Sequence, residues 1–525
     1  MSQTHGRRVL SMAGGTLVSR LTGLLRVLVL AWVLGFSPLA DAFNLANTVP
    51  NMLFDLVLGG VATATFIPVF VERLARDGER RAWRSISVVV TAASLVLVGA
   101  SLVAWFAAPW IIDAFTILNH AGGHAAAAVA DQRAVATSLL RWFVPQVFFY
   151  GLIGLATALL NVRHRFGSPA WVPVANNVVA IVVLVWFHLV DPAPTVASVA
   201  GSSHLALLGL GTTAGVAVQF ALLLPSLARA DLWRLRVRLD LRDPALRAVA
   251  RLGSWTLGVV AANQASLYVV LALAFAAGGS GPVSAYTYGW SFMQMPYAVV
   301  VVSVLAALTP QLARLATDED HDALAERLRF GLRQSLVIIV PATVTLIILS
   351  QPTVAILLNH VDARRTLAAG TVLAVLSAGL PGFTVFQLCV RGLQAMQRAR
   401  DVFVLYLFQN VATVVLAFVL GRHSLAGLTA SVSLAYAAAA LLSLVHLGRV
   451  RTPIAAALWS VHVRRSVGAS IVAGVAMASL YALGSSMTGV GLVARFVAAL
   501  AGGGVGYLLV VVIGARRVAQ RPPTV

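Results

Sequence analysis

The 525-residue chain has no lysine and one cysteine, and only 11% of its residues are charged. The single Cys389 excludes an intramolecular disulfide and any metal site built from cysteines. Because it lies in an apolar run, we expect it to be a packed thiol. With 59% hydrophobic residues and so few charges, the chain is predicted to be a membrane protein rather than a soluble one.

Apolar runs long enough to cross a bilayer recur along the whole chain. Prolines inside several of them, including Pro50, Pro145 and Pro296, predict broken or kinked helices. The predicted fold class is an all-α polytopic membrane protein of about fourteen transmembrane helices. Their limits are 9–35, 42–71, 86–110, 134–160, 170–190, 204–228, 247–276, 282–312, 330–358, 366–390, 402–421, 423–447, 466–486 and 490–514.

The basic residues are all arginines, and they gather in alternate loops, so the net charge of +20 does not indicate nucleic-acid binding. If the N-terminus is inside, cytoplasmic segments hold 30 of the 38 arginines and external segments hold 4. This bias predicts an even number of helices with both termini in the cytoplasm. The clusters at 73–84 and 229–251 are expected to contact anionic lipid headgroups.

Two arginines stand inside the first apolar span, Arg20 at ~16 Å and Arg26 at ~25 Å from its start. A guanidinium at such depth cannot face lipid, so both must face protein or a water-filled cavity. Asp55 lies in the second span near the depth of Arg26, and it is the only acid deep in a span. The residues are either an ion pair that fixes two helices or a cationic site for an anionic substrate. One carboxylate cannot neutralise two arginines, which favours the substrate site.

Sequence motifs of enzymes are missing in any credible context: there is no dinucleotide fingerprint, P-loop, zinc-protease motif or nucleophile elbow. The histidines of the external segment 111–133 have no metal-ligand spacing. We therefore expect a transporter without a cofactor or a metal site.

Several motifs occur in an order that resembles a known family. They are SRLTGLLR (19–26), ADAF (40–43), VPN (49–51), FIPVF (66–70), LLRWFVPQVFFYGL, LNVRHRFGSPAWVPVANNVV and QMPYAVVVVSVLAALTPQLAR (294–314). Together, over nearly the whole chain, they resemble the MurJ (MviN) lipid II flippases of the multidrug/oligosaccharidyl-lipid/polysaccharide exporter superfamily.

The resemblance implies two six-helix lobes, 1–230 (helices 1–6) and 231–450 (helices 7–12), followed by two additional helices and a short basic tail in 451–525. A central cationic cavity would bind the headgroup of lipid II, an undecaprenyl-pyrophosphate-linked saccharide-peptide, while the tail stays in lipid. By alternating access the lipid would pass from the inner to the outer leaflet of the bacterial cytoplasmic membrane. The implied role is peptidoglycan and cell-wall biogenesis, hence cell shape, with cell-wall synthesis proteins as candidate partners.

The predicted substrate-binding residues combine this resemblance with the intramembrane charges: Arg20, Arg26, Asp41, Asn51, Asp55 and Arg141. Arg20, Arg26 and Asp41 match functionally important family positions, and arginine donors suit the pyrophosphate. Three alternatives stay open. Asp41 is a substrate contact or the cap of the second span. Asp55 pairs with Arg26 or titrates, and Arg141 lines the cavity or snorkels to the outer headgroups.

This chain also departs from the family pattern. Phe54 and Asp55 stand where many relatives have arginines, and Ser291 stands at another cavity arginine. The acids that bind sodium in some relatives are replaced by amides, Asn263, Gln409 and Asn410. Rival interpretations are an exporter of another polyprenyl-pyrophosphate-linked saccharide or of drugs, and a non-transporting scaffold of the cell envelope.

Overall fold

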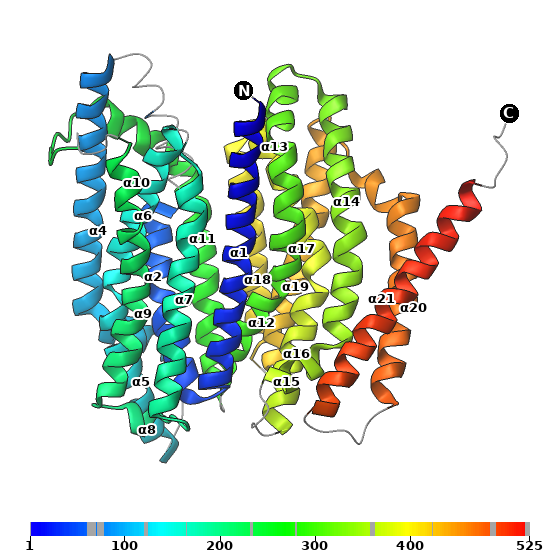
Figure 1. The fold of residues 1–525 in the computed structure, drawn as a ribbon, viewed down its shortest axis with the longest axis horizontal. Helices are drawn as coiled ribbons and strands as arrows, with labels where there is room; N and C mark the ends of the chain where they lie inside the picture. The colour runs from blue at the N-terminus through cyan, green and yellow to red at the C-terminus, as the bar shows by residue number, and fades with distance from the viewer. Residues whose placement is uncertain are drawn as a thin grey trace. The chain divides into compact units, whose positions relative to one another are not determined.

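The computed structural model describes residues 2–59, 70, 78–119, 124–163, 165–230, 235–278, 281–357, 363–422, 424–483 and 490–519. Within these ranges all regular structure is helical, which confirms the all-α fold class (Figure 1). The first half contains α1 (Ser2–Leu34), α2 (Pro38–Phe54), η1 (Asp55–Gly59), α4 (Gly78–Thr116), α5 (His124–Phe143), α6 (Pro145–Val162), α7 (Gly167–Val190), α8 (Val196–Val199), α9 (Ser203–Ala221), α10 (Leu224–Ala228) and α11 (Pro244–Ala276). The second half contains α12 (Pro282–Pro296), η4 (Tyr297–Val301), α13 (Val302–Thr317), α14 (His321–Ile348), α15 (Ser350–Leu357), α16 (Ala363–Ala378), α17 (Leu380–Ala395), α18 (Ala399–Leu420), α19 (Leu425–Arg449), η5 (Ala455–Trp459), α20 (Val461–Ala482) and α21 (Val490–Ala519).

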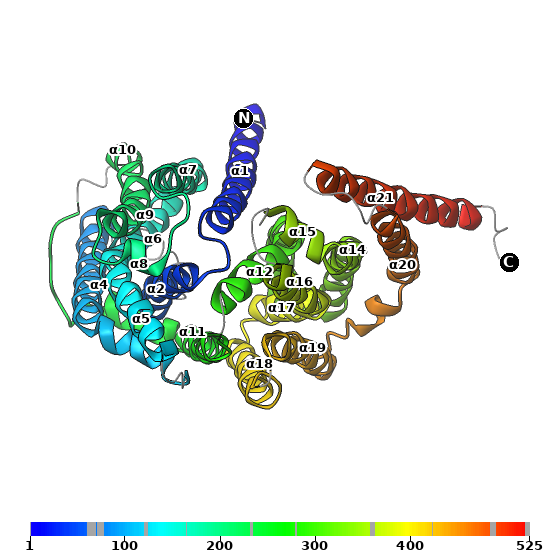
Figure 2. The ribbon, with the colours of Figure 1, turned by 90° about the horizontal axis from the view of Figure 1, so that it is seen from below.

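The predicted spans correspond one to one with the helices that the structure describes, with a single exception. Thirteen helices in the described ranges are long and apolar enough to cross a membrane. The exception is the predicted span 42–71: it begins in α2 and η1, and its later part lies outside the described residues. The chain is therefore a polytopic membrane protein, and most of its helices are seen nearly end-on in Figure 2.

Prolines interrupt the spans where the sequence places them. Pro145 divides the fourth span into α5 and α6, because a proline lacks the N–H that would continue the helical bonding. Pro296 ends α12 and is followed directly by the π-helix η4. The π-helix η1 likewise begins five residues after Pro50. Wider π-helical turns often mark functional positions in helices.

The helices pack as two compact units, residues 1–284 and residues 285–525. The division by packing falls after Ser284, whereas the sequence predicts a lobe boundary at residue 230. The reason is that α11 packs against α4 and η1 of the first unit. The division of the chain into functional lobes remains a prediction.

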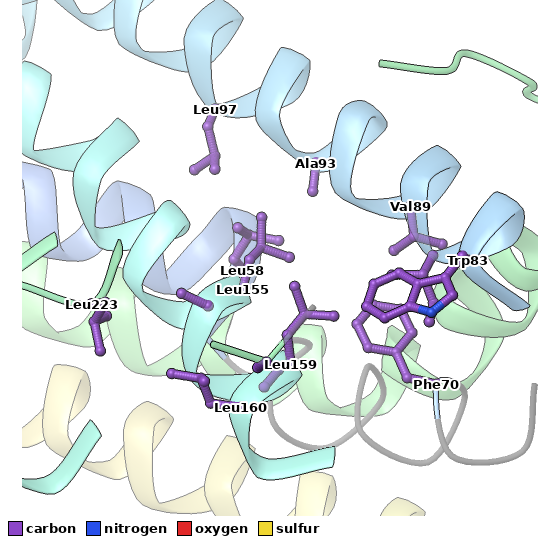
Figure 3. Packing of buried hydrophobic residues seen from close by; sticks show 14 of the residues in the cluster. Leu58, Phe70, Trp83, Val89, Ala93, Leu97, Leu155, Leu159, Leu160 and Leu223 are labelled. Atoms are coloured by element: carbon purple, nitrogen blue, oxygen red, sulfur yellow. The ribbon is translucent and has the colours of Figure 1, made fainter. Parts of the chain in front are cut away.

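An apolar core fills the first unit around α4 and α6 (Figure 3). Trp83 and Leu97 of α4 pack with Leu155 and Leu159 of α6, and Phe70 lies beside Trp83. In the second unit, the pair α20 and α21 packs on α14. The hydroxyls of Ser466 and Tyr507 both donate to the carbonyl of Val337 at 2.9 Å.

Candidate functional site

The helix that carries both arginines, α1, is held along α7. The Nδ2 group of Asn177, a residue only 7% exposed, donates to Ser19 O at 3.2 Å and to Thr22 Oγ1 at 3.0 Å. Gly15 lies so close to Trp171 that an added Cβ would approach the indole to 2.8 Å. A buried amide and a close helix contact therefore fix the rotation of α1 against α7.

This rotation leaves the two arginine side chains free of ion pairs. Arg20 is exposed and Arg26 is partly buried. Neither forms an ion pair with any residue that the structure describes. Arg26 is close enough to Tyr150 of α6 for its charge to act on the phenol. Two intramembrane cations without an acidic partner constitute an anion-binding element.

Asp55, at the start of η1, is bound by an amide rather than by an arginine. Its Oδ2 accepts a hydrogen bond from Gln264 Nε2 of α11 at 3.1 Å. The predicted Arg26–Asp55 pair is not formed among the described residues, and that prediction is wrong for this structure. The reason is helix packing: η1 packs against α11, whereas α1 packs against α7. The neighbouring Phe54 ring lies 5.9 Å from that of Tyr150, which Arg26 also approaches.

Asp41 lies in the first turn of α2 and is only 2% exposed. Its Oδ1 accepts from the Ser284 backbone N–H at 2.8 Å and from Ser284 Oγ at 2.7 Å. The backbone N–H groups of Gly281 and Val283 also hydrogen-bond this carboxylate. Asp41 thus binds the N-terminus of α12, where free N–H groups and the helix dipole favour an anion.

The cap of α2 itself is Ser37, whose side chain accepts from Ala40 N at 3.1 Å. The interpretation of Asp41 as the cap of its own helix is therefore wrong, because its acceptor oxygen is used by another helix. Gly281 allows this arrangement: its φ of +85° is a left-handed conformation, and an added Cβ would lie 2.5 Å from the backbone of Phe36.

A cavity of about 610 Å³ adjoins Asp41 within the first unit. Two of its polar side chains are occupied by backbone carbonyls: Gln132 Nε2 donates to Pro38 O at 2.8 Å, and Asn119 Nδ2 donates to Phe275 O at 3.3 Å. Its lining is mostly apolar and consists of Pro38, Asp41, Leu118, Asn119, Ala125, Ala128, Val129, Gln132, Phe275, Ala276, Gly278 and Pro282. These contacts tie the ends of α2, α5 and α11 together.

Arg141 of α5 lies against an apolar surface. Its Cζ is 5.3 Å from the centre of the Trp105 ring on α4. Trp105 is 43% exposed, and Phe106 beside it is 65% exposed. Such bare aromatic side chains on a spanning helix are typical of a surface that meets lipid. The geometry favours snorkelling over cavity lining for Arg141.

Asn51 is exposed on α2, and its Nδ2 donates to the Asn47 carbonyl one turn earlier at 2.8 Å. The six predicted residues therefore fall in separate places of the first unit. Arg20 and Arg26 share α1, Asp55 and Asn51 lie in the second half of the α2–η1 helix, Asp41 binds the start of α12, and Arg141 stacks on α4.

Metal ligands do not cluster in the described part of the chain: it has no group of three or more His, Cys, Asp or Glu that could hold an ion. The amides at the positions of the family's sodium ligands bond within their own helix. Gln409 Nε2 donates to Thr413 Oγ1 at 2.9 Å, and Asn410 Nδ2 donates to Tyr406 O at 2.8 Å.

Three residues that position the site were not predicted from the sequence: Asn177, Gln264 and Ser284. The available signal was a polar side chain in an apolar helix, since such groups need a partner when buried. Asn177 even lies within a quoted motif, but its partner on α1 is 155 residues away in the sequence.

Comparisons with known proteins agree on one family. The family profile described as "Lipid II flippase MurJ" matches residues 30–500. The lipid II flippase MurJ of Burkholderia cenocepacia is 29% identical over 399 residues, covering 74% of this chain and 73% of that protein. Among solved structures, a lipid II flippase MurJ in an inward closed conformation has a TM-score of 0.76 at 19% identity and covers 97% of this chain and 99% of its own. An inward-facing multidrug resistance MATE transporter of the MOP superfamily has a TM-score of 0.67 at 15% identity, covering 84% and 96%. The two structures are similar to this chain in fold.

Proposed function

The chain belongs to the lipid II flippase MurJ family, and we propose that it moves lipid II from the inner to the outer leaflet of the bacterial cytoplasmic membrane. The observation that carries this proposal is the pair of arginines in α1, which have no acidic partner among the described residues. Lipid II offers a pyrophosphate, and a guanidinium matches phosphate oxygens with a fork of donors.

The transport mechanism that follows is alternating access. The headgroup binds at Arg20 and Arg26 from the cytoplasm while the polyprenyl tail stays in lipid, and the site then opens outward. An inside-negative potential favours the return of the unloaded cationic site, by about 2.3 kcal/mol per charge per 100 mV. The protein itself makes and breaks no covalent bond in this cycle.

The topology belongs to the same proposal. The arginine bias supports both termini in the cytoplasm, with lobes at 1–230 and 231–450 and an additional helix pair in 451–525. Among the described ends of α20 and α21, apolar side chains such as Leu483 and Leu508 are strongly exposed, which suits a surface that meets the polyprenyl tail. Cell-wall synthesis proteins are the expected partners.

Translocation of lipid II in proteoliposomes tests the role of the two arginines. We expect Arg20→Ala and Arg26→Ala each to lower the rate about tenfold or more, because losing a charge-assisted bond to phosphate costs ~1.5–3 kcal/mol. The matched control is Arg422→Ala, which removes an exposed arginine stacked on Phe418 at the end of α18.

Two results would change the proposal. Rates of Arg20→Ala and Arg26→Ala equal to those of the control would exclude them as pyrophosphate ligands. Equal transport of a different polyprenyl-pyrophosphate-linked saccharide by the unmodified protein would make the wider substrate class the better assignment, since its pyrophosphate is the same.

A further inference from the structure

The chain between α10 and α11 lies against a membrane helix instead of hanging free. Here we call residues 235–243 the α4-bound segment; in Figure 2 it is part of the green trace beside α4. The backbone N–H of Arg236 donates to Ser87 Oγ at 3.2 Å, and that of Arg238 donates to Thr91 Oγ1 at 3.1 Å. Alternate N–H groups point the same way only in an extended chain, so the segment is extended along α4.

Both ends of the α4-bound segment are fixed to the first unit. Leu235 packs against the apolar core that contains Trp83. At the other end, Ser85 Oγ donates to Asp243 Oδ2 at 3.0 Å, and Asp243 Oδ1 accepts from Ala245 N as the cap of α11. The segment therefore has a defined position along α4.

The apolar side chains between these ends are bare. Val237 is 92% exposed, Leu239 is 60% exposed and Leu241 is 70% exposed. They alternate with Arg236, Arg238 and Arg242, which are exposed as well. Exposing three such side chains to water is unfavourable, by roughly 1.5–3 kcal/mol each relative to full burial.

The position along α4 indicates what covers them. Ser87 and Thr91 lie ~10 Å and ~16 Å along the helix from Arg80, the start of the apolar span. One turn after Thr91, on the same face, α4 presents Leu95, which is 53% exposed, and further on Phe106, which is 65% exposed. This face of α4 is covered by the segment near its beginning and by lipid beyond it.

The charges around the segment have one predominant sign. Arg80, Arg81 and Arg84 at the start of α4 are exposed, as are the three arginines of the segment. Arg247 Nη2 donates to Arg242 O at 3.0 Å. The acids Asp240 and Asp243 accept backbone N–H groups, Asp240 from Arg242 N at 3.0 Å. The surface therefore suits an anionic headgroup layer above acyl chains.

We propose that the α4-bound segment is an anchor in one leaflet of the bilayer, with anionic phospholipid as its ligand. Val237, Leu239 and Leu241 insert among the acyl chains, at the depth typical of interfacial segments. Arg236, Arg238 and Arg242 bind the phosphates of anionic headgroups. This interaction is independent of the transport site on α1.

Spin labelling of single cysteines tests the depth of the anchor. Native Cys389 is fully buried, so a label is directed to an introduced cysteine. The full-length Leu239→Cys protein is labelled in nanodiscs containing phosphatidylglycerol, with Asp318→Cys as a control in the exposed loop before α14. We expect the label at 239 to be more accessible to oxygen than to a water-soluble nickel complex, and the control to show the reverse.

Lipid charge is tested with the same Leu239→Cys label. Replacing phosphatidylglycerol by phosphatidylcholine, or combining Arg236→Gln, Arg238→Gln and Arg242→Gln, should shift the label toward the nickel complex. Equal nickel accessibility at 239 and 318 would show a solvated loop and overturn the anchor. Low accessibility to both reagents would show a protein partner instead of lipid, and a depth independent of lipid charge would overturn the assignment of anionic headgroups.

Discussion

Asp41 and Asp55 lie on the same α2–η1 helix, and they are bound in opposite ways. Asp41 is almost fully buried and accepts hydrogen bonds from the first turn of α12. Asp55 is only partly buried and has one neutral partner, Gln264. The difference shows that an acid in a membrane helix is not by itself a substrate contact. A carboxylate with several fixed donors holds helices together, whereas one with spare acceptor capacity stays available for chemistry.

The same contrast holds along α1. Asn177 uses its amide to bind Ser19 and Thr22, so it positions the helix. Arg20 and Arg26, on that helix, form no ion pair among the described residues. The fold therefore presents two charges on a helix whose rotation is fixed by a third, neutral residue.

The largest effect on stability is expected for Asp41→Ala. It leaves the buried N–H and hydroxyl of Ser284 without an acceptor, and each such group costs ~1–3 kcal/mol. We predict a loss of ~3 kcal/mol or more in the free energy of unfolding, measured by denaturant or thermal unfolding in detergent. Asp41→Asn keeps one acceptor oxygen and should lose less; equal stability of both variants and the unmodified protein would contradict the anchoring role.

A smaller loss, ~1–2 kcal/mol, is expected for Asn177→Ala, which removes both hydrogen bonds to α1. The effect should be local. Hydrogen exchange should rise in α1 around Ser19 and Thr22, while the exchange of α14 in the second unit serves as the internal control. Unchanged exchange in α1 would mean that the contact of Gly15 with Trp171 suffices to fix the helix.

Asp55→Asn should change stability by less than ~1 kcal/mol, because an amide oxygen can accept the same hydrogen bond from Gln264. We expect transport by this variant to keep its dependence on pH, measured as the initial rate of translocation in proteoliposomes buffered over a range of values. A flat pH profile for the variant would instead identify Asp55 as the titrating group of the cycle.

The smallest effect is expected for Arg141→Gln. It removes only a stacking contact on the exposed Trp105, worth ~0.5–1 kcal/mol at such sites. Translocation of lipid II should match the unmodified protein. A drop as large as that of Arg26→Ala would place Arg141 in the substrate path and contradict its assignment to the lipid-facing surface.

The sequence by itself determined the membrane class, thirteen of the predicted spans, the kinks at Pro145 and Pro296, and the family. These properties depend on runs of neighbouring residues, because the bilayer selects long apolar helices and proline acts on its own helix. The arginines of α1 were also evident from the sequence, since a charge in an apolar span is conspicuous wherever the helix packs.

Only the tertiary structure decided which polar groups bind one another. Asp41 meets Ser284 across 243 residues of sequence, and Gln264 meets Asp55 across 209. Nothing in the local pattern distinguishes these partners from other polar side chains, because their pairing depends on which faces of distant helices come into contact. For the same reason the sequence predicted an Arg26–Asp55 pair by depth alone, whereas packing of α1 on α7 and of η1 on α11 separates the two residues into different contacts.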